Sequence, residues 1–181
     1  NKNTIMTFFK ERLKNIKAFI FDVDGVLSID TSPLDDSGDP VRTANVKDGF
    51  AIRYALTNGF RIAIITGANT QRVKLRYKKL GVEHIYLNSF NKTECLADIL
   101  EKTGLQKDEI LYMGDDLVDF PIMKEIGVPT CPADAVPEIK AISLYISDKK
   151  GGEGCVRDVI EQVMRSQQKW AGQEITGIKA D

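Results

Sequence analysis

The sequence predicts an α/β fold built on a doubly wound parallel sheet, with helices on both faces. Two observations lead to this prediction. Short apolar runs that suit buried strands alternate with segments that have helical spacing, and such alternation is typical of parallel sheets. Several of the apolar runs also end directly in polar residues, and ligands of such sheets bind beyond the carboxyl ends of the strands.

The composition is that of an ordinary globular chain. Its 181 residues are 43% hydrophobic and 28% charged, which is enough for one domain with a sizeable core. We therefore expect a single domain over residues 1–181, with a flap at about 28–47 and a polar tail at about 171–181. The 25 basic and 26 acidic residues give a net charge of −1, so charge provides no basis for binding nucleic acid.

Neither membrane insertion nor export is expected. No apolar stretch approaches the length of a membrane span, and the polar start, residues 1–17, lacks the apolar region of a signal peptide. The cysteines, Cys95, Cys131 and Cys155, are scattered and odd in number, which suits a reducing compartment better than a disulfide framework or a zinc site. The expected location is the cytoplasm.

The chain begins with a predicted amphipathic helix. Its apolar residues recur at helical spacing and favour packing on the protein body over binding to a membrane surface: Ile5, Phe8, Phe9, Leu13 and Ile16. The apolar run 18–21 follows as a buried strand. Residues 28–47 are then polar and lack a helical stripe, which predicts a loop or a short β-hairpin flap, too small to be a cap domain.

After the flap, helices and strands alternate to the end of the chain. The expected helices cover residues 48–56, 69–80, 91–103, about 117–126 and 155–170. The expected strands cover residues 61–65, 84–87, 110–113, 128–131 and 144–146.

Two carboxylates follow the first strand directly. Asp22 and Asp24 point to the same side of an extended chain, until Gly25 lets the chain turn away. Like charges this close are unfavourable unless a cation or a proton lies between them. Asp is common at turns, but a pair that continues a buried strand favours a functional site.

Polar groups follow three more strands of the predicted sheet. They are Thr66-Gly67, Lys92, and the group Asp115, Asp116 and Asp119. Each alone has an ordinary explanation as a turn, a surface lysine or a helix cap. In a parallel sheet, however, all of them can meet Asp22 and Asp24 at one edge. Carboxylates combined with phosphate and water suit Mg²⁺ better than calcium or zinc, and a lysine with hydroxyl and amide donors suits phosphate oxygens.

These residues resemble the four motifs of the haloacid dehalogenase superfamily, in the right order. The motifs are Asp22-x-Asp24-Gly25-Val26, Thr66-Gly67, Lys92 and Gly114-Asp115-Asp116-x-x-Asp119. The resemblance covers about residues 16–170 and implies a Rossmann-like fold. Three further features resemble the cap-less, Mg²⁺-dependent, tetrameric group of 3-deoxy-D-manno-octulosonate 8-phosphate (Kdo 8-phosphate) phosphatases of lipopolysaccharide precursor biosynthesis: Asn45-Val46-Lys47-Asp48-Gly49, the short flap and Gly151-Gly152-Glu153-Gly154.

The resemblance implies the catalytic and metal-binding roles. Asp22 is expected to be the nucleophile that forms an aspartyl-phosphate, and Asp24 the general acid and base. The expected ligands of Mg²⁺ are Asp22, the backbone carbonyl of Asp24, and Asp115, with outer support from Asp116 and Asp119. Thr66 and Lys92 are expected to hold the phosphoryl oxygens, which suits a reaction that depends on positioning and charge neutralisation.

The resemblance also implies a sugar-acid phosphate as substrate. The expected substrate-binding residues are Gly67, Arg76, Lys47 and Asp48, with Arg76 donated by the adjacent subunit of a homotetramer. Three departures from the family pattern concern the sugar rather than the chemistry. Ala68 and Lys47 stand where arginine is usual, and Ile29-Asp30 replaces an Asp-Gly pair.

Three alternatives stay open at this point. A nonulosonate (sialic-acid-type) 9-phosphate is a second candidate substrate, although Ala68 lacks the acidic group that related 9-phosphate phosphatases place there. A receiver domain of the response-regulator type also combines acidic residues, Thr, Lys and Mg²⁺, but it lacks the acid/base that Asp24 provides. A non-catalytic subunit on a phosphatase fold is disfavoured because Asp22, Asp24, Lys92 and Asp115 are all present.

Overall fold

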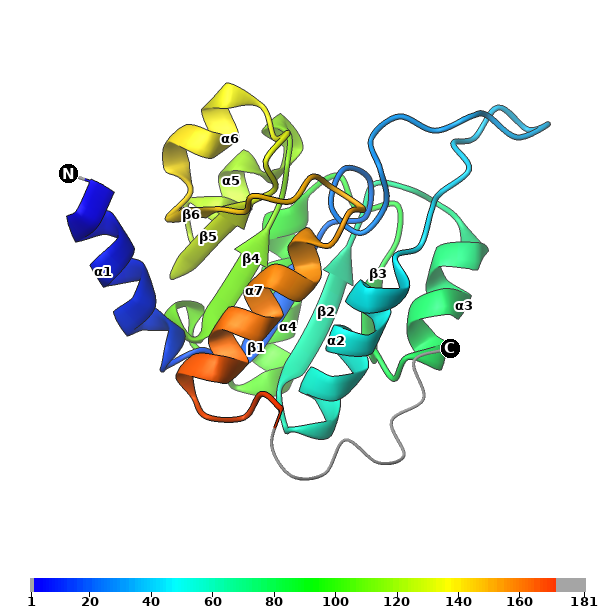
Figure 1. Cartoon of the computed structure of the whole chain (residues 1–181). Helices are drawn as coiled ribbons and strands as arrows, with labels where there is room; N and C mark the ends of the chain where they lie inside the picture. The colour runs from blue at the N-terminus through cyan, green and yellow to red at the C-terminus, as the bar shows by residue number, and fades with distance from the viewer. Residues whose placement is uncertain (1, 172–181) are drawn as a thin grey trace.

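The structure, a computed structural model, describes residues 2–171, with only the backbone for residues 2–4. Its centre is one parallel sheet with the strand order β3-β2-β1-β4-β5-β6 (Figure 1). The strands are β1 (Ala18–Phe21), β2 (Arg61–Ile65), β3 (His84–Tyr86), β4 (Ile110–Met113), β5 (Val128–Cys131) and β6 (Tyr145–Ile146). The predicted doubly wound sheet is confirmed, whereas the predicted tail from residue 172 lies outside the described residues.

Helices cover both faces of the sheet (Figure 1). One face packs against α1 (Lys2–Leu13), α2 (Val46–Thr57), α3 (Gln71–Lys79) and α7 (Cys155–Ser166). The other packs against α4 (Lys92–Thr103), α5 (Phe120–Met123) and α6 (Pro137–Ile142). Two short 3-10 helices, η1 (Lys107–Glu109) and η2 (Leu117–Asp119), flank β4. Because both faces are covered, the strands are almost continuously apolar, as the sequence indicated.

The register of the strands brings their carboxyl ends to one edge. Phe21, the last residue of β1, lies opposite Ile64 of β2 and Met113 of β4. Side chains of β1 alternate between the two cores, with Phe21 in the first and Ile20 in the second. Residues that follow β1, β2 and β4 therefore emerge beside one another.

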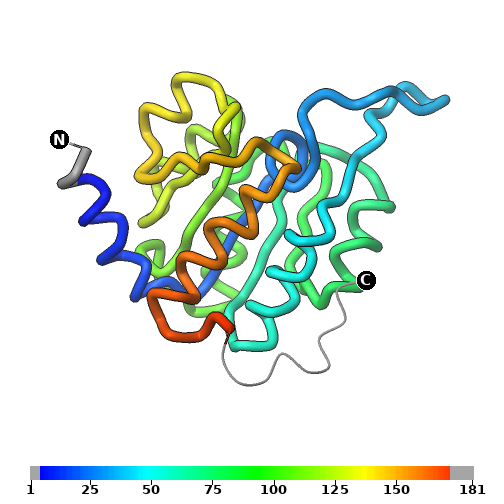
Figure 2. Tube along the Cα trace, in the orientation of Figure 1, coloured from blue at the N-terminus to red at the C-terminus, as the bar shows by residue number. Residues whose placement is uncertain are grey.

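Residues 28–45, called the arm below, leave that edge and return to α2. Figures 1 and 2 show this segment extending away from the body before it turns back. The arm contains one antiparallel bridge, between Leu34 and Pro40, and its tip is a turn in which Asp35 Oδ1 accepts from the backbone N–H groups of Ser37 and Asp39. It is the predicted flap, in the form of a minimal hairpin.

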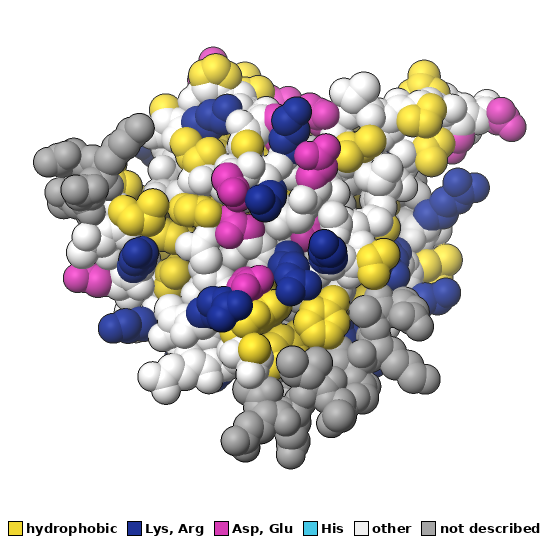
Figure 3. Space-filling model, in the orientation of Figure 1, with side chains coloured by type: hydrophobic (Ala, Val, Ile, Leu, Met, Phe, Trp, Pro, Cys, Tyr) yellow, Lys and Arg dark blue, Asp and Glu magenta, His cyan; other side chains and the backbone are white. Residues whose placement is uncertain are grey.

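The helical predictions were less accurate at their ends. In the first helix Phe9 and Leu13 are buried, but Ile5 and Phe8 remain exposed. The helix expected up to residue 126 is divided into η2 and the short α5, α7 ends at Ser166 rather than at Trp170, and α6 was not predicted. No helix within residues 2–171 has the length and apolar character needed to cross a membrane. Basic and acidic side chains are interspersed over the visible face of the molecule (Figure 3), in keeping with the balanced net charge.

Candidate active site

The end of β1 places Asp22 at the centre of the candidate site. Its backbone N–H donates to Met113 of β4 (3.1 Å), and its Oδ1 accepts from the N–H of Val23 (2.6 Å). Gly25 turns the chain with φ of 76°, and a Cβ at this position would lie 1.9 Å from Oδ2 of Asp115. Glycine is therefore required both for the turn and for the close approach of Asp115.

Lys92, the first residue of α4, reaches the same point from the neighbouring helix. Its Nζ lies 2.7 Å from Asp22 Oδ2 and 2.7 Å from Asp119 Oδ1, and its side chain is almost fully buried. Burial lowers the pKa of Lys92, but the charges of Asp22 and Asp119 outweigh burial and hold this pKa above its ordinary value. One ammonium thus serves two carboxylates.

Asp119 supports the site through hydrogen bonds to its neighbours. It is fully buried, and besides Lys92 it accepts hydrogen bonds from the hydroxyl of Tyr112 and from the backbone N–H of Asp115 (3.0 Å). A Cβ at Gly114 would lie 2.3 Å from Cγ of Asp119, so only glycine leaves room for this side chain. Both carboxylate oxygens of Asp119 are thus occupied, and they hold Asp115 in place.

The site has more buried negative charge than Lys92 can balance. Carboxylate oxygens of Asp22, Asp115 and Asp119 lie within 4.8 Å of one another. Burial and the charge of Asp119 raise the pKa of Asp22 to about 7, and burial and the charge of Asp22 raise that of Asp115 to about 8. A divalent cation between the oxygens of Asp22 and Asp115 would remove this repulsion, so these two residues fit a hard cation such as Mg²⁺.

Thr66 and Gly67 follow β2 at the same edge. Thr66 is buried, its N–H donates to Tyr86 of β3 (2.9 Å), and its Oγ1 accepts from the N–H of Ala68 (3.1 Å). Gly67 is exposed, and together with Thr66 it lines the cavity above Asp22. Asp116 is also exposed, and its side chain accepts from the N–H of Leu117 at the start of η2.

These predicted residues line one cavity of about 530 Å³. Its lining includes Asp22, Asp24, Thr66, Gly67, Lys92, Asp115 and Asp116. The structure therefore brings together residues from four separate parts of the chain, as the parallel sheet predicts.

The structure also adds Arg42 of the arm to this cavity, a residue that the sequence analysis missed. Arg42 binds both carboxylate oxygens of Asp24, at 2.9 and 3.0 Å. The feature of the sequence that could have indicated Arg42 is that the acidic segment 28–47 contains only two basic residues, Arg42 and Lys47.

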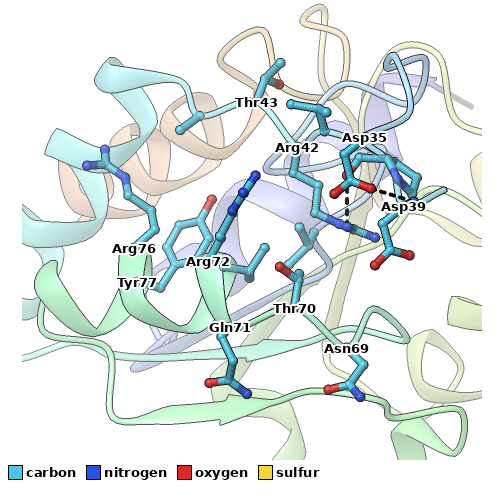
Figure 4. Close-up of a pocket in the computed structure, with 15 residues that line it drawn as sticks. Asp35, Asp39, Arg42, Thr43, Asn69, Thr70, Gln71, Arg72, Arg76 and Tyr77 are labelled. Carbon is cyan, nitrogen blue, oxygen red and sulfur yellow. Dashed lines mark hydrogen bonds between the residues drawn. The ribbon is translucent and has the colours of Figure 1, made fainter. Parts of the chain in front are cut away.

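Arg76 lies in an adjoining cavity of about 460 Å³, between α3 and the arm. Figure 4 shows Arg42 reaching from the arm, and Arg72 and Arg76 rising from α3, around this space. The two cavities share Arg42, Asp39 and Asn69 in their linings. Nε of Arg76 is buried without a hydrogen-bond partner among the described residues.

The structure does not bring Lys47 or Asp48 to either cavity. The side chain of Asn45 caps α2 by accepting from the backbone N–H groups of both residues, which lie in the first turn of the helix. Lys47 is exposed and lines a different groove, beside the start of α7. Asp48 is buried and accepts from the N–H of Arg157 (2.9 Å), so it caps the first turn of α7 instead.

The fold and this set of residues define a class of protein. A parallel sheet whose β1 ends in two aspartates, with Thr66, Lys92 and Asp115 around them, is the arrangement of the haloacid dehalogenase-like hydrolases. The family model with that description matches residues 84–160.

Comparison with individual proteins narrows the class. The chain is 36% identical over 165 residues to the 3-deoxy-D-manno-octulosonate 8-phosphate phosphatase of Salmonella typhi, covering 91% of this chain and 88% of the relative. The crystal structure of the same enzyme from Yersinia pestis superposes with a TM-score of 0.87 at 33% identity, over 91% of this chain and 89% of that one. The structure of the Moraxella catarrhalis enzyme in complex with magnesium, phosphate and KDO superposes with a TM-score of 0.86 at 32% identity. The match covers 91% of this chain and 95% of that one. The chain belongs to the family of the 3-deoxy-D-manno-octulosonate 8-phosphate phosphatases.

Proposed function

We propose that this protein is a Mg²⁺-dependent phosphatase that hydrolyses Kdo 8-phosphate to Kdo and phosphate in lipopolysaccharide precursor biosynthesis. The observation that carries the proposal is the convergence of Asp22, Lys92 and Asp115 at the carboxyl end of β1, in a chain that matches enzymes of this name over nine-tenths of its length. The same match favours the eight-carbon sugar acid over a nonulosonate 9-phosphate.

Asp22 acts as the nucleophile in this proposal. Its Oδ1 is fixed by the N–H of Val23, and its Oδ2 faces Lys92. Attack of Asp22 on phosphorus forms an aspartyl-phosphate, which water then hydrolyses, so one difficult displacement is divided into two easier ones. Thr66, the N–H of Gly67 and Lys92 hold the equatorial phosphoryl oxygens, where charge develops.

Asp24 acts as the general acid and base. It gives a proton to the leaving alkoxide in the first step and takes one from the attacking water in the second. Asp22, Asp115 and the backbone carbonyl of Asp24 would hold Mg²⁺, with Asp116 and Asp119 supporting them from outside. The bound ion supplies positive charge that offsets the phosphate dianion and the buried carboxylates.

Location and assembly are part of the proposal. All three cysteines are free thiols, which supports a reaction in the reducing cytoplasm. We also propose a homotetramer, since within residues 2–171 the arm is the only flap beside the cavity that holds Asp22, and an active site of this kind is shielded from water during catalysis. In that assembly a neighbouring subunit would complete the site, and Arg76 could be donated across the interface.

A panel of substrates tests the proposal. Phosphate release from Kdo 8-phosphate, a nonulosonate 9-phosphate, glucose 6-phosphate and p-nitrophenyl phosphate is measured with Mg²⁺ and after exhaustive dialysis against EDTA. The highest kcat/KM is expected for Kdo 8-phosphate, with activity lost on chelation and restored by Mg²⁺. A higher kcat/KM for the 9-phosphate would identify the alternative substrate. Full activity after chelation would remove Mg²⁺ from the mechanism, and a stable phosphoprotein without turnover would indicate a receiver-like module.

A further inference from the structure

Arg42 contacts the proposed acid/base with a fixed geometry. Its Nε lies 2.9 Å from Asp24 Oδ1 and its Nη2 lies 3.0 Å from Asp24 Oδ2. A guanidinium that binds both oxygens of a carboxylate sets its direction as well as stabilising it. The side chain of Arg42 is only 13% exposed, whereas that of Asp24 is 47% exposed. The carboxylate therefore stays open to the cavity while its partner is shielded from solvent.

The arm is fastened to the body next to Arg42. The N–H of Thr43 donates to Oγ of Ser28 (2.8 Å), and Oγ1 of Thr43 accepts from the N–H of Ile29 (3.1 Å). Ser28 is itself only 1% exposed, so the arm is attached to a buried residue of the body. Nη1 of Arg42 also donates to the carbonyl of Pro40 (3.1 Å). Arg42 thus projects from the anchored base of the arm and not from its tip.

Arg42 is also the cation best placed to orient Asp24. The residues that line the catalytic cavity include two cations, Arg42 and Lys92, and Lys92 is already bound to Asp22 and Asp119. Asp30 and Asp39 line the same cavity, yet Arg42 forms its ion pair with Asp24. The arm therefore contributes a specific contact to the acid/base and not only a cover for the site.

We propose that Arg42 is a positioning residue for proton transfer by Asp24. In the first step the P–O bond to the leaving group breaks as Asp22 bonds to phosphorus, and the carboxyl proton of Asp24 passes to the leaving oxygen. In the second, water attacks phosphorus, its proton passes to Asp24, and Asp22 is released. Both transfers need Asp24 to point at the reacting oxygen, and a misplacement of about 1 Å costs roughly 10²-fold in rate. This inference rests on the proposed function, because only a phosphatase needs Asp24 in this role.

Substrates with different leaving groups distinguish a role of Arg42 in proton transfer from a purely structural role. A sugar alkoxide needs a proton to leave, whereas p-nitrophenolate does not. Arg42→Gln is therefore compared with wild type in single-turnover experiments on Kdo 8-phosphate and on glucose 6-phosphate, which has no carboxylate, and in the burst of p-nitrophenol from p-nitrophenyl phosphate. Arg42→Lys is the conservative variant. Arg61→Gln, an exposed arginine at the start of β2, and Asp36→Asn, an exposed charge at the arm tip, are the matched controls.

The expected pattern is a fall of roughly tenfold to a hundredfold in the single-turnover rate on both sugar phosphates, as general acid catalysis contributes about 10² to 10⁴. The rate of the p-nitrophenol burst, which reports formation of the aspartyl-phosphate, should stay within about twofold of wild type. The rate of the slower phase that follows should fall, because hydrolysis of the aspartyl-phosphate still needs Asp24 as the base. Arg42→Lys recovers part of the loss, the controls match wild type, and Arg42→Gln has no further effect in an Asp24→Asn background.

Two results would overturn the inference while the proposed function stands. An equal loss in the burst and in both sugar phosphates would assign Arg42 to folding or to phosphate binding. A rise in KM confined to Kdo 8-phosphate would assign it to the substrate carboxylate. A wild-type protein that releases neither p-nitrophenol nor phosphate would instead overturn the proposed function itself.

Discussion

The ammonium of Lys92 lies 2.7 Å from the carboxylate of Asp22, and both groups are almost completely removed from solvent. Asp119 shares the same ammonium at the same distance. Two buried carboxylates with one cation leave a net negative charge below the phosphate site. This arrangement is acceptable only because a further cation can be bound at Asp22 and Asp115.

The first prediction concerns this pair. Lys92→Met keeps most of the apolar stem but leaves two buried carboxylates without a cation, and breaking a buried pair in this way costs about 3–5 kcal/mol. Urea unfolding should show that loss in the free energy of unfolding, and turnover should disappear. Adding Asp22→Asn to the variant should recover part of the stability. Wild-type stability for Lys92→Met would contradict the account of the charges.

The second prediction concerns Asp48 and pH. Burial raises the pKa of Asp48 from 3.8 to about 6 in the folded protein. Since the folded protein then holds this proton more tightly than the unfolded chain, stability is lost as pH rises from about 4 to about 6. Above that window the loss amounts to roughly 3 kcal/mol, from about two pKa units. Melting temperatures measured between pH 4.5 and 7 should fall less steeply for Asp48→Asn, and an unchanged slope would rule out this contribution.

The third prediction concerns recognition of the sugar acid. Arg76→Ala removes a guanidinium from the cavity next to the catalytic one, and losing a charged hydrogen-bond pair to a substrate costs about 2–5 kcal/mol. The kcat/KM for Kdo 8-phosphate should fall accordingly, while p-nitrophenyl phosphate, which has no carboxylate, should be almost unaffected. Lys78→Ala, an exposed charge on the same helix, is the control. Equal losses on both substrates would assign Arg76 to folding or assembly.

The fourth prediction concerns assembly. The arm carries exposed apolar side chains, with Leu34 67% and Val41 39% exposed, as expected of a segment that packs against other subunits. Sedimentation should show a tetramer, and Leu34→Asp should shift it toward smaller species with lower activity. Asp36→Asn removes a charge at the same tip but introduces no charge into the interface, so this variant should leave the tetramer intact. A fully active monomer would defeat the prediction.

The sequence allowed most of the sheet to be predicted because its four central strands, β2, β1, β4 and β5, are buried on both faces. Ile62 to Ile65 and Ile110 to Met113 are uninterrupted apolar runs, and the polar residues that follow them mark the edge where the site forms. The same logic predicts that Asp22, Thr66, Lys92 and Asp115 lie together, and the structure brings them into one cavity.

The arm and the sugar-binding residues could not be derived in this way. Arg42 reaches Asp24 because Thr43 is bound to Ser28, a contact between residues far apart along a loop with no periodicity. Lys47 is expected at the substrate from its place in a motif, but α2 packs against α7, and Lys47 lines a groove beside α7 instead. Both outcomes depend on tertiary contacts that a pattern of residue types does not contain.

The last prediction concerns Asp22, which we propose to be the nucleophile of a phosphatase for Kdo 8-phosphate. Asp22→Asn preserves the size of the side chain and removes the attacking charge, and removing one charge from a repulsive cluster should leave the fold intact. The measurement is kcat on Kdo 8-phosphate at saturating Mg²⁺, with thermal unfolding as the check on folding. We expect a folded variant whose turnover is lower by about 10³-fold or more. A folded Asp22→Asn protein with near-normal turnover would contradict it.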